Sequence, residues 1–264
     1  MTARKNLAKP LCFAAVFITL AACSSDLTGN NKQSVQLSFT TNSTSSVAAT
    51  GMRMSPDITV GANNELVLSK VQVVVDKIEL NEEDNTSCVG EIEDGGDDHG
   101  EAGEECEDVS RNPVLVDIPV DDAAHVVLSV PLTPGTYRKL EAKLEPARDD
   151  ATAFNTANPT LVGKSVRVEG TYKGTPFVFT SAVRSGLEME FDPPLVIDAT
   201  TTNATVSIDV AKWFLDSNGN AIDPTSATAG SNALSRIEDN IRRSFHAFED
   251  DDHSGEDDHS EHHG

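Results

Sequence analysis

The sequence predicts an all-β protein: an antiparallel β-sandwich with one C-terminal amphipathic helix and a disordered acidic tail. About ten short runs of alternating apolar and polar residues lie between turn signals, which is the pattern of sandwiches and barrels. No helical segments alternate with these runs, which excludes a parallel α/β sheet. The length of 264 residues allows one large or two small domains with a sizeable core.

The chain begins with a secretory signal. Basic residues precede a short apolar run at 11–20, and Leu20–Cys23 reads Leu-Ala-Ala-Cys. Charge, apolar segment and small residues in this order are typical of a signal peptide. A transmembrane helix is the alternative, but about 20 apolar residues are needed to span a bilayer, and polar Ser24 follows the run too early.

Cys23 resembles the lipobox cysteine of bacterial lipoproteins, whose thiol receives a diacylglycerol before the signal peptide is cleaved. The resemblance implies that residues 1–22 are removed and that Cys23 carries three acyl chains in a Gram-negative bacterium. Stable membrane anchoring requires at least two chains. Ser24, the second residue of the mature chain, implies the outer membrane by the same resemblance. Residues 23–33 then form a polar tether.

The first strands of the sandwich follow the tether. Period-two alternation predicts a strand at residues 35–39, and a segment rich in Ser, Thr, Asn and Gly predicts a long loop at 41–65. The strongest strand pattern covers residues 66–80 and changes phase at Lys70 and at Asp76–Lys77. Because a bulge reverses the faces to which side chains point, we expect bulges or bends at these two positions.

Three further strands are predicted in the middle of the chain, at residues 114–118, 126–132 and 137–144. Pro134–Gly135 separates the last two strands and fits the central pair of a type II turn, where glycine accepts the positive φ. The sequence therefore predicts a hairpin at this position.

The alternation continues at residues 166–172, 177–179, 187–191, 195–197 and 206–214. Lys173–Gly174 predicts a tight turn between the first two of these runs, and Pro193–Pro194 interrupts the later ones. Together, the strands assign residues 34–215 to the sandwich, from which residues 81–112 project as an acidic loop.

One helix is predicted within residues 216–248, after a loop. A single helical stripe carries the apolar side chains of Leu234, Ile237, Ile241, Phe245 and Phe248. Ser235 and Glu238 fit a capping box. Glu238 with Arg242, and Asp239 with Arg243, have the spacing of favourable ion pairs on a helix.

Acidic residues dominate the charge of the chain. Once three basic residues leave with the signal peptide, the remaining 242 residues carry about −26. Such a charge disfavours nucleic acid and anionic lipid surfaces as partners, and it attracts cations. Ten Asp and Glu residues gather at 91–108, and residues 249–264 form a second acidic segment with added histidines.

Two cysteines remain for a disulfide after Cys23 is acylated, namely Cys88 and Cys106. In an oxidising compartment we expect them to form a bridge that closes the acidic loop. A metal site formed by both cysteines and His99 is the alternative. It lacks a second histidine and a CxxC spacing.

Motifs of catalysis are missing from the mature sequence, including Gly-x-Ser-x-Gly, HExxH, the P-loop and GxGxxG. His125 is the one histidine within the strand region, and nothing in its spacing makes a catalytic triad. The sequence therefore predicts a protein that is not an enzyme.

Calcium is the candidate cofactor, because the tail matches the spacing of an EF-hand loop. The matching oxygen ligands are Asp250, Asp252, Ser254, Glu256, Asp258 and Glu261, with Gly255 at the sharp turn. The predicted helix through Phe248 resembles the incoming helix of an EF-hand. The loop departs from the pattern in having Asp257 where an aliphatic residue is usual, and too few residues follow for a second helix.

Three alternatives remain for these acidic segments. The tail can be a solvated chain without a ligand. Its four histidines, His253, His259, His262 and His263, could hold a transition metal weakly. A further calcium turn is conceivable at Asp216–Asp223, although Asn-Gly at its centre favours a simple tight turn.

Four segments together resemble a family of bacterial and archaeal lipoprotein domains of unknown function: Val71–Leu80, Val114–Ile118, Leu132–Tyr137 and Leu140–Leu144. The family has a valine-rich strand ending in Ile-Glu-Leu, then Val-Asp-Leu, then Leu-Pro-Ala-Gly-Thr-Tyr; here Thr133–Pro134 replaces Pro-Ala. The resemblance spans about residues 35–215. It implies a prealbumin-like or immunoglobulin-like sandwich and brings no reaction or functional residue.

These observations predict a lipid-anchored envelope lipoprotein of the outer membrane, with a non-catalytic binding or structural role. The membrane is its partner through Cys23, and a protein or a glycan is its expected ligand. A surface protein that binds calcium or a transition metal through its tail is the alternative.

Overall fold

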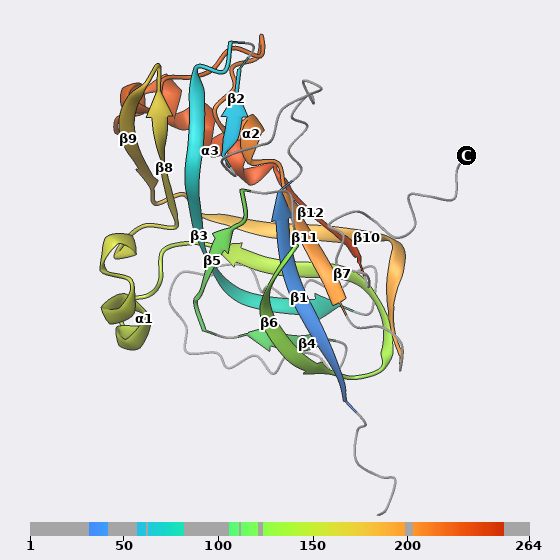
Figure 1. Ribbon diagram of the computed structural model, residues 1–264. Coiled ribbons are helices and arrows are strands. Elements are labelled where there is room, and N and C mark those ends of the chain that lie inside the picture. Colours follow the sequence, from blue (N-terminus) through green and yellow to red (C-terminus); the bar gives the residue numbers. More distant parts are fainter. Residues whose placement is uncertain are drawn as a thin grey trace, which may run out of the picture. The chain divides into compact units, whose positions relative to one another are not determined.

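Two β-sheets form the framework of the computed structural model (Figure 1). The structure describes residues 32–41, 57–61, 63–81, 106–110, 112–120, 124–198 and 203–250, all within the unit Asn31–Gly264, with the backbone alone for 106–109. The prediction of a mostly β chain is confirmed, and the two sheets are arranged as in a sandwich, but the described residues contain five short helical segments where one helix was predicted.

The smaller sheet contains, in spatial order, β12 (Phe245–Glu249), β11 (Asn203–Ile208), β1 (Gln33–Thr41) and β6 (His125–Leu132). β1 runs parallel to β11, whereas the other two pairs are antiparallel. The prediction of a wholly antiparallel sandwich is therefore wrong at one pair. A parallel pair needs a long connection, and most of the domain separates β1 from β11 in the sequence.

The larger sheet has eight strands. Five of them are neighbours in the order β10 (Ser185–Ile197), β7 (Gly135–Leu144), β3 (Leu66–Asn81), β8 (Val166–Tyr172) and β9 (Thr175–Ser181). The other three each pair with β3: β2 (Ile58–Val60), β4 (Cys106–Ser110) and β5 (Val114–Ile118). β8 and β7 follow one another along one side of β3, and β2, β5 and β4 follow along the other. Figure 1 shows β3 curving from the β8–β9 end of the sheet to the β7–β10 end.

Bulges in β3 lie where the phase of the sequence changes. The register with β8 shifts between Leu68 and Lys70, and the register with β7 shifts between Asp76 and Glu79. Lys77, within the second shift, has a positive φ of 50°. Both predicted irregularities are confirmed, because each extra residue returns the following valines and leucines to the core face.

The predicted hairpin of β6 and β7 is wrong. β6 pairs with β1 in the smaller sheet, whereas β7 pairs with β3 and β10 in the larger one. Gly135 begins β7 and does not have the positive φ of a type II turn. Thr133 and Pro134 instead carry the chain from one sheet to the other, and the Tyr137 hydroxyl donates a hydrogen bond to the Thr133 carbonyl (2.8 Å) across this corner.

The predicted C-terminal helix is shorter than its apolar stripe. Helix α3 covers Asn232–Arg242, and the next segment, which holds Phe245 and Phe248, is strand β12. Phe245 and Ala247 are buried and alternate with exposed His246, a period of two that suits a strand. The predicted boundary of the sandwich at residue 215 therefore lies too early.

Capping of α3 differs from the prediction as well. The Ser231 hydroxyl accepts a hydrogen bond from the Leu234 amide (3.1 Å), so Ser231 is the N-cap in place of Ser235. Arg242 lies 4.0 Å from Glu238, as expected, and 2.9 Å from Asp239. The N-cap of α3 thus lies four residues before the predicted one.

Other elements refine the predicted loops and turns. β2 lies in the predicted loop 41–65, and β4 pairs the end of the predicted acidic loop with β3. The β8–β9 hairpin is confirmed, with positive φ at Lys173 and Gly174, as a type I′ turn requires. β10 continues through Pro193–Pro194 with a shift of register in place of a break.

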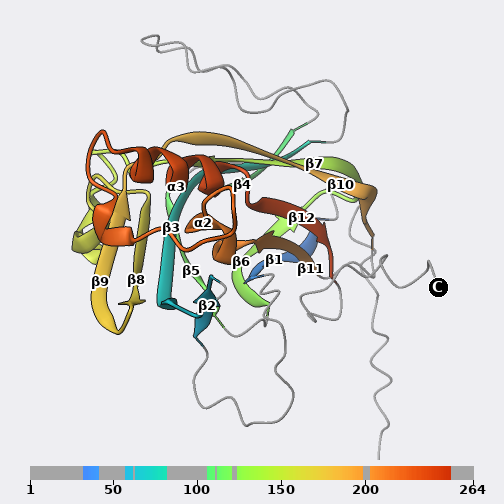
Figure 2. The ribbon, with the colours of Figure 1, turned by 90° about the horizontal axis from the view of Figure 1, so that it is seen from above.

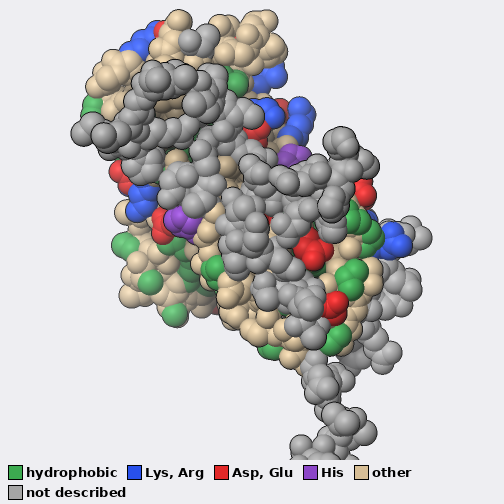
Figure 3. Space-filling view, turned by 45° about the vertical axis from the view of Figure 1, so that its right-hand side comes forward, with side chains coloured by type: hydrophobic (Ala, Val, Ile, Leu, Met, Phe, Trp, Pro, Cys, Tyr) green, Lys and Arg blue, Asp and Glu red, His purple; other side chains and the backbone are tan. Residues whose placement is uncertain are grey.

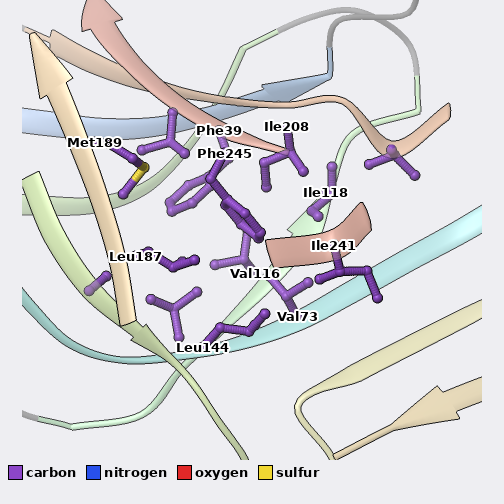
Figure 4. Close-up of a cluster of buried hydrophobic side chains, with 14 of the residues drawn as sticks. Phe39, Val73, Val116, Ile118, Leu144, Leu187, Met189, Ile208, Ile241 and Phe245 are labelled. Carbon is purple, nitrogen blue, oxygen red and sulfur yellow. The ribbon is translucent and has the colours of Figure 1, made fainter. Parts of the chain in front are cut away.

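Apolar side chains from both sheets and α3 share one core. Figure 4 shows Phe39 and Ile208 of the smaller sheet close to Val73 and Val116 of the larger one, together with Ile241 of α3. The outer face of the larger sheet is covered near its centre, because α1 (Thr152–Ala157) and the 3-10 turn η1 (Pro159–Leu161) pack over Val74 of β3.

The remaining helices close the sandwich at its β9 side. They are α2 (Val210–Trp213) and the 3-10 turn η2 (Pro224–Ser226), with α3 beside them. Glu238 of α3 accepts a hydrogen bond from the Ser181 hydroxyl at the end of β9 (2.6 Å), so α3 lies where β9 gives way to β10 (Figure 2). Trp213 is fully buried and donates to the Ser244 hydroxyl (2.7 Å). Within the described ranges, these helical segments lie on the core side of β8 and β9, where Phe177 and Phe179 contact Phe214.

Candidate functional site

A groove of about 500 Å³ lies on the outer face of the larger sheet, where β2, β3, β8 and β9 run side by side. Its lining consists of Asp57, Val67, Ser69, Glu169, Gly170, Thr171, Pro176, Phe177 and Val178. Strand alternation explains most of this set: Leu66, Leu68 and Val168 point into the core, so their neighbours along the strands point outward. Most of the outward side chains are short, and the sheet surface between them is consequently hollow.

Gly170 allows the backbones of β3 and β8 to approach each other closely beneath the groove. A Cβ atom at this position would lie 2.0 Å from the Val67 carbonyl oxygen, well inside van der Waals contact. This close approach occurs beside the β3 bulge, where Leu68 pairs with Gly170 and Lys70 pairs with Glu169. Glycine in a strand typically marks such a bulge or close backbone approach.

The charged side chains of the groove lining are both carboxylates, those of Asp57 and Glu169. Glu169 is held by an ion pair with Arg167, whose guanidinium also donates to the Gln72 amide oxygen (3.4 Å). Gln72 in turn donates to the Asp117 carboxylate (2.7 Å). This row of polar side chains fixes Glu169 in place, whereas Asp57 forms no ion pair within the described part of the chain.

A basic side chain lies in the β8–β9 turn, beyond the lining residues Thr171 and Pro176 that flank this turn. The Lys173 ammonium lies 5.0 Å from the centre of the Tyr172 ring. A hydrogen bond with Tyr172, followed by the carboxylate of Glu65, raises the pKa of Lys173 above its ordinary value. Lys173 therefore stays positive in this turn.

Chemically, the groove is suited to binding. Within the described ranges, no three His, Cys, Asp or Glu side chains are placed to hold a metal ion. On the face drawn in Figure 3, acidic, basic and histidine side chains of the described residues lie next to one another instead of in patches of one charge. A site of short apolar side chains and two carboxylates can hold a ligand by contact and charge.

The predicted calcium loop has its first residue in the structure. Asp250 is fully buried, its carboxylate accepts a hydrogen bond from the Thr205 hydroxyl (2.8 Å), and its carbonyl accepts one from Asn203 (2.8 Å). The predicted incoming helix is wrong, because β12 precedes this residue. The other candidate ligands, Asp252, Ser254, Glu256, Asp258 and Glu261, lie outside the described residues, and calcium binding stays a prediction.

The cysteine predictions also fall largely outside the described residues. Cys23 and Cys88 lie beyond them, and for Cys106 the structure gives only the backbone, at the start of β4. The lipid anchor and the disulfide therefore stay predictions. Among the described residues, no helix is long and apolar enough to cross a membrane.

Two weaker candidates from the sequence, Asp216 and His125, lie among the described residues. The Asp216 carboxylate accepts hydrogen bonds from the amides of Asn218 (2.8 Å) and Asn220 (2.9 Å), and the side-chain bond from Asn220 lowers the pKa of Asp216. This is the tight turn that the Asn-Gly pair favours. His125 is exposed at the start of β6.

The sequence interpretation missed the groove. Asp57 lies in the predicted loop 41–65, and Gly170 lies within the alternating run 166–172. A glycine inside a strand pattern is a usable signal for close backbone approach, but its partner Val67 is about a hundred residues away in the sequence.

No family model, curated protein or solved structure matches the chain. The resemblance to the lipoprotein domain family stays a prediction.

Proposed function

We propose that this chain is a lipid-anchored envelope protein whose β-sandwich binds a ligand in the groove without catalysing a reaction. The signal segment and Cys23 support the anchor, and the outer membrane is the proposed location. We place the sandwich in the prealbumin-like or immunoglobulin-like class on the sequence motifs that carry the family resemblance.

The groove is the observation that carries this proposal. Its floor is three strands of the larger sheet, which are held by the core beneath them, so the hollow exists before a ligand arrives. A preformed site loses less conformational freedom on binding. Val178 is 57% exposed in the lining, although a valine in a strand usually faces apolar neighbours. An exposed apolar side chain beside two carboxylates suits a ligand with both apolar and charged parts.

Substitution in the groove tests the proposal. Val178→Arg places a long charged side chain across the groove, and Val196→Arg makes the same change at a valine that is 48% exposed on β10, outside the lining. We expect the wild type and Val196→Arg to retain the same partners from envelope extracts, and Val178→Arg to lose them. Identical retention by all three proteins, with equal thermal stability, would contradict binding in the groove.

A further inference from the structure

A second hollow adjoins the groove. It measures about 230 Å³ and shares Ser69 with the groove. Its lining consists of Ser69, Lys70, Val71, Asp117, Ile118, Pro119, Val120 and His125. The two hollows therefore lie on either side of the β3 bulge, and Ser69 is their common wall.

The position of the second hollow follows from a gap in the sheet. β2 pairs with β3 through Leu68, and β5 pairs with β3 from Val71 onward. On this side, Ser69 and Lys70 have no partner among the described strands. An extended peptide can fill such a gap, because main-chain groups of an unpaired strand segment accept a further strand.

The two hollows differ in their charged residues. Asp57 and Glu169 are the charged residues that line the first, whereas the second contains one cation, that of Lys70, together with His125. Asp117 also lines the second hollow, but its carboxylate accepts the hydrogen bond from Gln72 (2.7 Å). Within the described ranges Lys70, which is exposed, forms no ion pair.

We propose that the two hollows form one site for a short extended peptide that carries a basic group and an acidic group. The basic group lies over Asp57 in the groove, the acidic group lies over Lys70 and His125, and the main chain between them crosses the gap at Ser69–Lys70. A glycan fits this lining less well, because its one aromatic ring, that of Phe177, is buried and cannot stack on a sugar. The inference rests on the proposed function of the groove and names its ligand class.

Three capped tetrapeptides test the inference by NMR titration of the labelled mature protein. They are acetyl-Lys-Ala-Ala-Glu-amide, a form with Gln in place of Glu, and a form with Gln in place of Lys. The two alanines span about 7 Å when extended, enough for the two-residue gap. We expect the charged peptide to shift the amide signals of Gly170 and Val120 together, with one dissociation constant.

Two variants separate the two ends of the site. Lys70→Gln should weaken the doubly charged peptide about threefold and leave the peptide without Glu unchanged. Asp57→Asn should weaken both Lys-containing peptides and leave the peptide without Lys unchanged. Arg236→Gln and Asp149→Asn are matched controls, because each makes the same charge change at an exposed residue outside both hollows.

Two results would overturn the inference. Equal affinities of wild type and Lys70→Gln for the doubly charged peptide would show that the second hollow takes no part. Absence of any shift at Gly170, while Val178→Arg still abolishes capture of envelope partners, would reject a peptide of this class but keep the groove as a binding site. Failure of both experiments would reject the proposed function itself.

Discussion

Removal of the Thr205 hydroxyl should destabilise the C-terminal edge of the smaller sheet. Thr205 is fully buried; its hydroxyl donates to the Asp250 carboxylate (2.8 Å) and accepts a hydrogen bond from the Asn203 amide (2.8 Å). Valine has nearly the same shape but leaves a buried carboxylate oxygen without its donor. Hydrogen bonds to charged groups contribute about 1.5–3 kcal/mol each, so Thr205→Val should cost about 2–3 kcal/mol.

Urea unfolding followed by circular dichroism measures this cost. With a urea dependence of about 2–3 kcal/mol per molar for a domain of this size, the midpoint should fall by about 1 M. Thr205→Ser is the matched control, because it keeps the hydroxyl and loses one methyl group, which contributes about 1 kcal/mol or less. An unfolding free energy of Thr205→Val within about 0.5 kcal/mol of the wild type would refute the reasoning.

Calcium adds a second comparison to the same experiment. Because the carboxylate of Asp250 is already bound within the sheet, millimolar calcium should leave the difference between Thr205→Val and Thr205→Ser unchanged. A difference that changes with calcium would mean that Asp250 leaves Thr205 to bind the ion, as the predicted calcium loop requires.

Two further predictions concern the anchor and the groove floor. Cys23→Ala should move the protein from the membrane fraction to the soluble fraction, because the lipid is the proposed anchor. Immunoblots of both fractions check this, and an unchanged amount of protein in the membrane fraction would contradict it. Gly170→Ala should cost about 2 kcal/mol or more in thermal unfolding, because the new Cβ would lie 2.0 Å from the Val67 carbonyl oxygen. Gly186→Ala, which has no atom within 4 Å of its new Cβ, should change stability little; equal losses in both variants would contradict this account.

Local pattern predicted the strands well, because side-chain alternation depends on neighbours in the sequence. The phase changes at Lys70 and Asp76–Lys77 indicated the bulges of β3 for this reason. The same alternation shows which side chains face the core, but not which sheet a strand joins. The corner at Pro134 therefore looked like a hairpin, although its two strands belong to different sheets.

Periodicity was ambiguous at the C-terminus. Phe245 and Phe248 continue the helical stripe of α3, and pairing of this segment with β11 decides in favour of a strand.

The groove could not be predicted from the sequence for a related reason. Asp57, Gly170 and Val178 meet through the pairing of β2, β3, β8 and β9, and no local sequence pattern specifies such a meeting of distant segments.

Strand β10 carries features that oppose pairing of an edge strand with a second chain. It ends the larger sheet, and among the described strands it pairs only with β7. Exposed Glu188, Glu190 and Asp192 line it, and Pro193–Pro194 removes two main-chain donors from its length. Charge and proline on an edge strand prevent a second chain from adding to the sheet. If the proposed lipid anchor holds several copies in one membrane plane, such an edge would oppose their aggregation when they meet.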